Sequence, residues 1–113
     1  MARILRGGIY WADLNPVRGH EQGGSRPVLI LSHDLFNERA QRAIGMAITS
    51  QAPRVAYPLV WPLPKSTLPK PSWVLISQLR TLATERLGEL QLAQLSDTQM
   101  GEILEGLWQL VAS

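Results

Sequence analysis

The sequence predicts an α+β fold: a small, mostly antiparallel sheet or barrel with one short inserted helix and a terminal amphipathic helix laid against it. Three observations predict this class. Short apolar runs are separated by turn residues, one short helical pattern interrupts them, and the end of the chain repeats apolar residues at helical spacing. A length of 113 residues suits a single domain over residues 1–113, which can bury one core without disulfides or metals.

The first half of the chain contains three expected strands and one helix. Residues 9–14 alternate and are rich in aromatic side chains, residues 26–32 form a continuous apolar run, and residues 43–50 read as a third strand. Asn-Pro and Gly-Gly mark a loop over residues 15–25. A short helix is expected over residues 34–42. Its expected cap is Ser32 or Asp34, and its expected inner side is Leu35, Phe36 and Ala40.

The second half continues the sheet and ends in a helix. Residues 56–63 look like a strand, but Pro58 and Pro62 lack amide donors, which places this strand at an edge or a bend. Residues 73–77 form a further strand, and β character continues to Leu87. The last helix starts at Ser96 or Asp97, and its apolar stripe consists of Met100, Ile103, Leu104, Leu107, Trp108 and Val111. One face of this helix is therefore expected to lie on a core or on a partner.

The charge is unevenly distributed along the chain. The net charge is only +2, but residues 1–80 hold ten Lys/Arg and four Asp/Glu, while residues 81–113 hold one Arg and five acids. A basic body with an acidic end favours an anionic partner for the basic part. The alternative is a well-solvated surface whose asymmetry is accidental.

The composition argues against several classes of protein. There is no cysteine, and the only histidines are His20 and His33, so neither thiol chemistry nor a dedicated zinc site is expected. The acids are scattered and form no apparent two-metal cluster, so no metal or other cofactor is expected. The start lacks a long apolar segment, and no apolar run approaches the ~20 residues of a membrane helix. We therefore expect a soluble, cytoplasmic domain with no membrane partner.

Arg26 is the most conspicuous candidate for chemistry. It stands between a polar loop and an apolar strand, and Pro27 fixes the backbone beside it. A guanidinium binds phosphate in a bidentate way and stays charged at working pH. The structural alternative is a clasp in which Arg26 pairs with Glu21 or Asp13.

Other polar residues stand where expected strands end or loops begin, which is where sites usually form. These candidates are Thr49, Ser50, Gln51, Ser77, Gln78 and Arg80, with His20 as a possible general base. Each is equally compatible with an ordinary turn or strand end. Of the tryptophans, we expect Trp108 in the core or at a dimer interface, Trp11 mostly in the core, and Trp61 to be the most exposed.

Three segments together resemble one family, the MazF/PemK toxins of bacterial toxin–antitoxin pairs. The segments are RGGIYWADLNPVRGHEQGGSRPVLILS, AITSQ and SWVLISQLRTLATERLGEL, and the resemblance covers about residues 6–110. It implies an SH3-like barrel, usually a homodimer, that acts as a metal-independent, sequence-specific endoribonuclease on single-stranded RNA. It also implies inhibition by an antitoxin with a disordered acidic tail.

The resemblance also implies roles for single residues. The arginine that opens the second strand and the threonine that ends the third form the family's catalytic pair, here Arg26 and Thr49. The Glu-Gln pair in the first loop helps to close over RNA, and a glutamine before the LRT element lies near the RNA groove. The expected RNA-binding residues are Glu21, Gln22, His20, Ser50, Gln51, Gln78 and Arg80. Ser77 departs from the acid that many relatives carry, and the proline-rich segment over residues 56–72 is unusual, so the RNA sequence recognised is left open.

RNA can be cut without metal when its own 2′-hydroxyl attacks the adjacent phosphate. An arginine suits the stabilisation of the resulting dianion, and a threonine hydroxyl can supply a second donor. The base can be Glu21, His20 or a water molecule, and the sequence does not choose among them. Two other functions fit the same fold: a toxin that poisons DNA gyrase, which would lack the Arg/Thr pair, and a plain RNA- or peptide-binding module.

Overall fold

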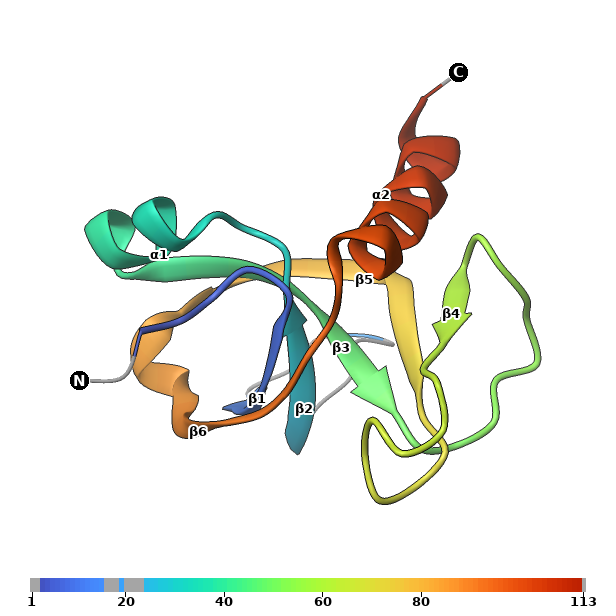
Figure 1. Cartoon of the computed structure of the whole chain (residues 1–113), viewed down its shortest axis with the longest axis horizontal. Helices are drawn as coiled ribbons and strands as arrows, with labels where there is room; N and C mark the ends of the chain where they lie inside the picture. The colour runs from blue at the N-terminus through green and yellow to red at the C-terminus, as the bar shows by residue number, and fades with distance from the viewer. Residues whose placement is uncertain (1–2, 16–18, 20–23, 113) are drawn as a thin grey trace.

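The computed structural model describes residues 3–15, 19 and 24–112, and it has the predicted α+β architecture (Figure 1). Its elements are β1 (Gly8–Asp13), β2 (Ser25–Ile30), α1 (Asp34–Ala40), β3 (Arg42–Thr49), β4 (Val60–Pro62), β5 (Trp73–Ala83), a 3-10 turn (Thr84–Arg86), β6 (Leu87–Gln94) and α2 (Asp97–Val111). The six strands form one sheet in the order β4-β5-β3-β2-β1-β6. Every neighbouring pair in it is antiparallel.

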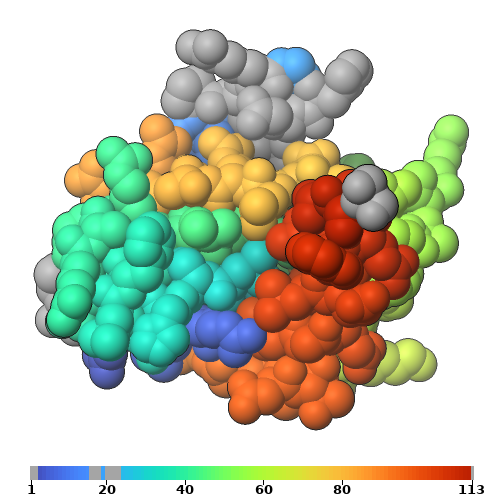
Figure 2. Space-filling model, turned by 90° about the horizontal axis from the view of Figure 1, so that it is seen from above, coloured from blue at the N-terminus to red at the C-terminus, as the bar shows by residue number. Residues whose placement is uncertain are grey.

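The sheet carries a hydrophobic cluster on each of its two faces. All six strands contribute to the cluster on what we call the inner face, with Tyr10, Val28, Ala47, Val60, Leu75, Leu82 and Leu87 among its members. The other face, the helix face, is covered by α2, whose Met100 and Ile103 pack against Ile9, Leu29, Met46 and Ile76. Because strand residues alternate between faces, neighbours in sequence belong to different clusters. Both helices lie on one side of the sheet, with part of β5 between them (Figures 1 and 2).

Most expected elements are confirmed, with boundaries that shift by one to four residues. The exception in length is β4, which covers only Val60–Pro62 of the expected residues 56–63, and it does lie at an edge of the sheet. The strand β6 was not expected, because its sequence LGELQLAQ contains glycine and glutamate and buries no regular set of side chains. Pairing with β1 nevertheless holds it in the sheet.

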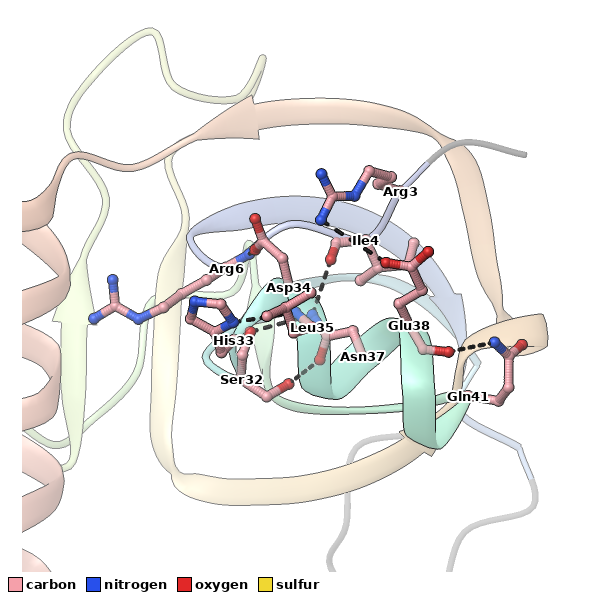
Figure 3. A network of polar contacts seen from close by, with 10 residues as sticks. All are labelled: Arg3, Ile4, Arg6, Ser32, His33, Asp34, Leu35, Asn37, Glu38 and Gln41. Carbon is pink, nitrogen blue, oxygen red and sulfur yellow. Dashed lines mark hydrogen bonds and ion pairs between the residues drawn. The ribbon is translucent and has the colours of Figure 1, made fainter.

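The expected inner side of α1 is wrong. Leu35 and Phe36 are 50% and 43% exposed and Ala40 is exposed, whereas Asn37 is 2% exposed. The Asn37 amide nitrogen donates to the carbonyl oxygens of Ile4 at 2.9 Å and Ser32 at 3.1 Å, and its oxygen accepts from the Ser32 hydroxyl (Figure 3). The helix is thus fixed by polar contacts, since a buried amide needs partners for its donors and acceptor.

The N-terminal cap of α1 is His33, between the two residues expected for that role. Its ring nitrogen Nδ1 accepts from the Leu35 amide at 3.1 Å, while the Asp34 carboxylate accepts from the Arg6 amide at 2.8 Å (Figure 3). The chain start is therefore attached to α1 from two sides, through Asp34 and through Asn37.

The helix α2 begins as expected, with Ser96 as its cap and a reciprocal capping box to Gln99. Gly106 allows the helix to lie close to the sheet, because a Cβ atom there would stand 2.9 Å from Ile76 Cδ1. Met100 and Ile103 are buried, but Val111 is 68% exposed. In the part of the chain that the structure describes, no helix is long and apolar enough to span a membrane.

The expectations for Trp11 and Trp61 are wrong, while for Trp108, expected in the core or at a dimer interface, only the core is ruled out. Trp11, expected in the core, is 49% exposed, and Trp108 is 64% exposed and so lies outside the core. Trp61, expected to be the most exposed, is 7% exposed, and its Nε1 donates to Glu102 Oε1 at 3.2 Å. The proline-rich flanks suggested a surface position, but β4 places Trp61 on the helix face beneath α2.

Candidate active site

Arg26 and Thr49 lie on neighbouring strands at the same end of the sheet. Val28 of β2 is paired with Ala47 of β3, and the strands are antiparallel. Arg26 stands two residues before Val28, and Thr49 stands two residues after Ala47. Because the strands are antiparallel, these two steps lead to the same end of the sheet. Both continue the alternation of Val28 and Ala47, so both belong to the inner face. The fold therefore brings together the two residues expected to be the catalytic pair.

The two residues differ in their surroundings. Thr49 is 5% exposed and closes β3, and its Oγ1 accepts a hydrogen bond from the Gln51 amide at 3.1 Å. A hydroxyl that accepts one bond still has its own hydrogen to donate. Arg26 is half-buried on β2 and retains partial contact with solvent. The pair thus consists of a buried hydroxyl held by one hydrogen bond and a guanidinium that an incoming anion can reach.

Gln78 and Arg80 extend this arrangement across β5. Gly45 of β3 is paired with Ile30 on one side and with Arg80 on the other, which places Arg80 on the inner face beside Leu82. Gln78 stands two residues earlier on β5, where the pairing with β3 is irregular, and both side chains are half-buried. Arg80 is thus level with Ile30 at the end of β2, four residues along the sheet from Arg26, and Gln78 stands nearer to the end where β3 closes.

A pocket of about 520 Å³ lies beside Arg26. Arg26 and Ser50 border it together with Trp11, Pro27, Ile48, Leu92 and residues of the β4–β5 loop. Its walls are mostly apolar, and Lys70 adds a second cation at the rim. Such a pocket suits a planar, partly apolar group attached to an anion, as in a nucleotide.

The remaining expected residues divide into two groups. Ser50 and Gln51 follow β3 directly and are exposed, so they stand beside Thr49 as expected. His20, Glu21 and Gln22 lie outside the described residues. Among the described residues, no three His, Cys, Asp or Glu side chains gather where they could hold a metal ion.

Sequence reasoning missed the residues at the base of the β1–β2 connection. The Asn15 side chain accepts from the Gly24 amide at 3.1 Å, and Arg86 donates to the backbone carbonyl oxygens of Asp13 and Asn15. Gly24 has φ of +73°, a conformation that favours glycine. The Asn-Pro and Gly-Gly signals mark this loop, but nothing in the sequence connects it to Arg86.

A half-buried guanidinium on one strand and a buried hydroxyl at the end of the neighbouring strand are groups that suit the binding of a phosphate. Comparison with known proteins identifies the family. Residues 5–111 match the family described as "PemK-like, MazF-like toxin of type II toxin-antitoxin system". The chain belongs to this PemK/MazF family, and its sheet has the SH3-like barrel fold of MazF structures.

Individual relatives agree in sequence and in structure. The chain is 43% identical over 102 residues to the protein named Endoribonuclease MazF of Staphylococcus saprophyticus, covering 88% of this chain and 84% of that protein. It resembles the crystal structure of MazF from Deinococcus radiodurans with a TM-score of 0.87 and 29% identity over 100% of both chains. A MazE-MazF crystal structure from the same organism has a TM-score of 0.77 and 27% identity, covering 96% of this chain and 95% of that one.

Proposed function

We propose that this endoribonuclease toxin cuts single-stranded RNA, including messenger RNA, by attack of a ribose 2′-hydroxyl on the adjacent phosphate, without a metal ion. The observation that carries the proposal is the placement of Arg26 and Thr49 on the same face of neighbouring strands, two residues beyond one cross-strand pair. The family membership and the similarity to an endoribonuclease MazF support the choice of RNA as substrate.

The chemistry assigns one task to each member of the pair. The 2′-hydroxyl passes its proton to the base as its oxygen forms a bond to phosphorus and produces a phosphorane-like dianion. The bond to the 5′-oxygen then breaks, and that oxygen takes up a proton from the protonated base or from water. Arg26 stabilises the dianion with a forked set of donors, a kind of contribution worth about 10²–10³ in rate. Thr49 donates its hydroxyl hydrogen to a non-bridging oxygen while its Oγ1 stays held by the Gln51 amide. The products are a 2′,3′-cyclic phosphate and a 5′-hydroxyl.

The residues around the pair bind the neighbouring nucleotides. Gln78 and Arg80 on β5 contact the strand along the inner face, and Ser50 and Gln51 contact it where β3 ends. His20, Glu21 and Gln22 complete the RNA-binding set from the β1–β2 connection. Glu21, His20 and an ordered water remain the alternatives for the base. Recognition of bases by these side chains is what makes cleavage sequence-specific.

The partners follow from the same proposal. A relative from Deinococcus radiodurans is solved as a MazE-MazF complex, and we infer that this chain is neutralised by a cognate antitoxin with an acidic segment. We also infer a homodimer through the exposed apolar side of α2, which consists of Leu104, Trp108 and Val111. A messenger RNA substrate places the active protein in the cytoplasm.

One experiment tests the core of the proposal. The purified protein is incubated with a long single-stranded RNA in excess EDTA, and the ends of the products are analysed. We expect cleavage at a few specific sites, with a 2′,3′-cyclic or 3′-phosphate and a 5′-hydroxyl at each. RNA that stays intact would indicate that the protein is a non-catalytic binding module. Products with a 5′-phosphate would indicate attack by water.

A further inference from the structure

Arg86 connects two parts of the chain that are far apart in sequence. It ends the 3-10 turn between β5 and β6, and its Nη1 donates to the carbonyl oxygen of Asp13 at 3.3 Å and to that of Asn15. These carbonyls stand 73 and 71 residues earlier in the chain. A single guanidinium therefore attaches the end of β1 to the β5–β6 connection.

The two carbonyls belong to a closed set of hydrogen bonds at the base of the β1–β2 connection. The Leu14 amide donates to the Gly24 carbonyl at 3.0 Å, and the Gly24 amide donates to the Asn15 side chain at 3.1 Å. The Asn15 amide donates in turn to the Asp13 carboxylate at 3.1 Å. These bonds hold Asn15 and Gly24 together. Arg86 adds hydrogen bonds to the carbonyl oxygens of Asp13 and Asn15.

This base lies directly beside Arg26. Ala12 is paired with Arg26 on one side and with Leu87 on the other, so Arg86 and Arg26 are separated by one strand. Asp13 is paired with Ser25, the residue before Arg26. Arg86, Asp13 and Ser25 also border one pocket of about 430 Å³. A shift of Asp13 or Asn15 would therefore be passed to Ser25 through the pairing of Asp13 with Ser25, and from Ser25 to its neighbour Arg26.

We propose that Arg86 is a positioning residue for RNA cleavage: by holding the carbonyls of Asp13 and Asn15, it fixes the base of the β1–β2 connection and thus the place of Arg26. This inference rests on the proposed role of Arg26. Its bonds to the loop are solvent-exposed, so their loss should leave the fold intact. Catalytic alignment is more sensitive, because a displacement of about 1 Å can cost about 10²-fold in rate.

The test measures kcat, KM and the salt dependence of RNA binding for Arg86→Ala, with Arg42→Ala as the matched control. Arg42 is an exposed arginine at the opposite end of β3 from Thr49. We expect Arg86→Ala to lower kcat about 10- to 100-fold with KM changed less than about threefold. Arg42→Ala should keep the wild-type kcat. The affinity of Arg86→Ala for an uncleavable, 2′-deoxy-substituted strand should depend on salt as it does in the wild type, with the same slope of log affinity against log salt concentration.

Two further arms separate the possible outcomes. In hydrogen exchange, the amides of Leu14 and Gly24 should exchange faster in Arg86→Ala while those of β3 do not. Asn15→Ala should lower kcat as well, and the double variant should lose less than the product of the two losses, because both act on one base. Arg86→Lys should fall between wild type and Arg86→Ala, and it carries the same test if the alanine variant does not fold.

Three results would overturn the proposal. The first is a wild-type kcat in Arg86→Ala. The second is a loss carried by KM together with a salt slope lower by about 0.7, which would make Arg86 a direct phosphate contact. The third is unchanged exchange at Leu14 and Gly24. If the wild-type protein itself left RNA intact, the proposed function would fail, while the exchange measurement would still decide whether Arg86 holds this base.

Discussion

Arg26 and Thr49 stand two residues beyond the same cross-strand pair, Val28 and Ala47, on the inner face of the barrel. The relative position of their backbones is therefore set by the pairing of two central strands. Electrostatic catalysis needs donors that are in place before charge develops, and strand pairing supplies such a frame.

The first prediction concerns Arg26. Arg26→Ala should lower the rate of RNA cleavage by about 10²–10³, because the dianion loses its forked donor. Arg26→Lys should restore little, since an ammonium cannot reproduce two parallel hydrogen bonds. The measurement is single-turnover cleavage of an RNA with one site. Arg42→Ala is the control, and a wild-type rate in Arg26→Ala would remove the central assignment.

The second prediction concerns the Thr49 hydroxyl. Thr49→Val keeps the shape of this buried side chain and removes the donor, so cleavage should fall by about 10-fold, less than for Arg26→Ala. Thr49→Ser keeps the hydroxyl and should retain most of the activity. Thr81→Val, at an exposed position of β5, is the control. Equal losses in the valine and serine variants would mean that packing, and not the donor, matters at Thr49.

The third prediction concerns the substrate. An RNA whose nucleotide 5′ to the scissile bond lacks its 2′-hydroxyl should bind but remain uncut, because the nucleophile is missing. It should therefore inhibit cleavage of normal RNA competitively, as measured by initial rates at several concentrations. A deoxy-substituted strand cut at the normal rate would show that water is the nucleophile and that the roles given to Arg26 and Thr49 are wrong.

The fourth prediction concerns the antitoxin. An acidic peptide bound over Arg26 and Arg80 should compete with RNA, and its affinity should fall as salt is raised. Titration of a labelled deoxy-substituted strand with the antitoxin measures the competition. Arg80→Ala should weaken both ligands. RNA binding that persists at saturating antitoxin would place the inhibitor elsewhere.

The fifth prediction concerns stability. Asn37→Leu should lower the free energy of unfolding by about 1–3 kcal/mol, because it leaves the carbonyl of Ile4 and the Ser32 side chain without their partner at a buried position. Leu35→Ala, on the exposed side of α1, should change it by no more than about 0.5 kcal/mol. Urea denaturation compares the two, and equal effects would contradict the polar attachment of α1.

The sequence predicts well whatever depends on local pattern. The strands that carry Arg26 and Thr49 follow from apolar runs that end in polar residues, and the cap of α2 follows from Ser96. It fails where contacts join distant segments. Trp11 and Trp61 are both aromatic residues in strands, and only the sheet order and the position of α2 decide which is covered. Arg86 donates to carbonyl oxygens 71 and 73 residues away, and the hydrophobic periodicity of a sequence does not predict such a bond.

The edge position of β4 has a consequence for assembly. An open sheet edge offers unpaired amide and carbonyl groups to which a strand from another chain can add, the usual route to amyloid-like aggregation. Pro62 removes one of these amides within the three-residue β4, and Pro58 and Pro64 flank it. This edge therefore resists extension by a neighbouring molecule. We accordingly expect two copies to associate by packing side chains, and not by pairing strands at the β4 edge.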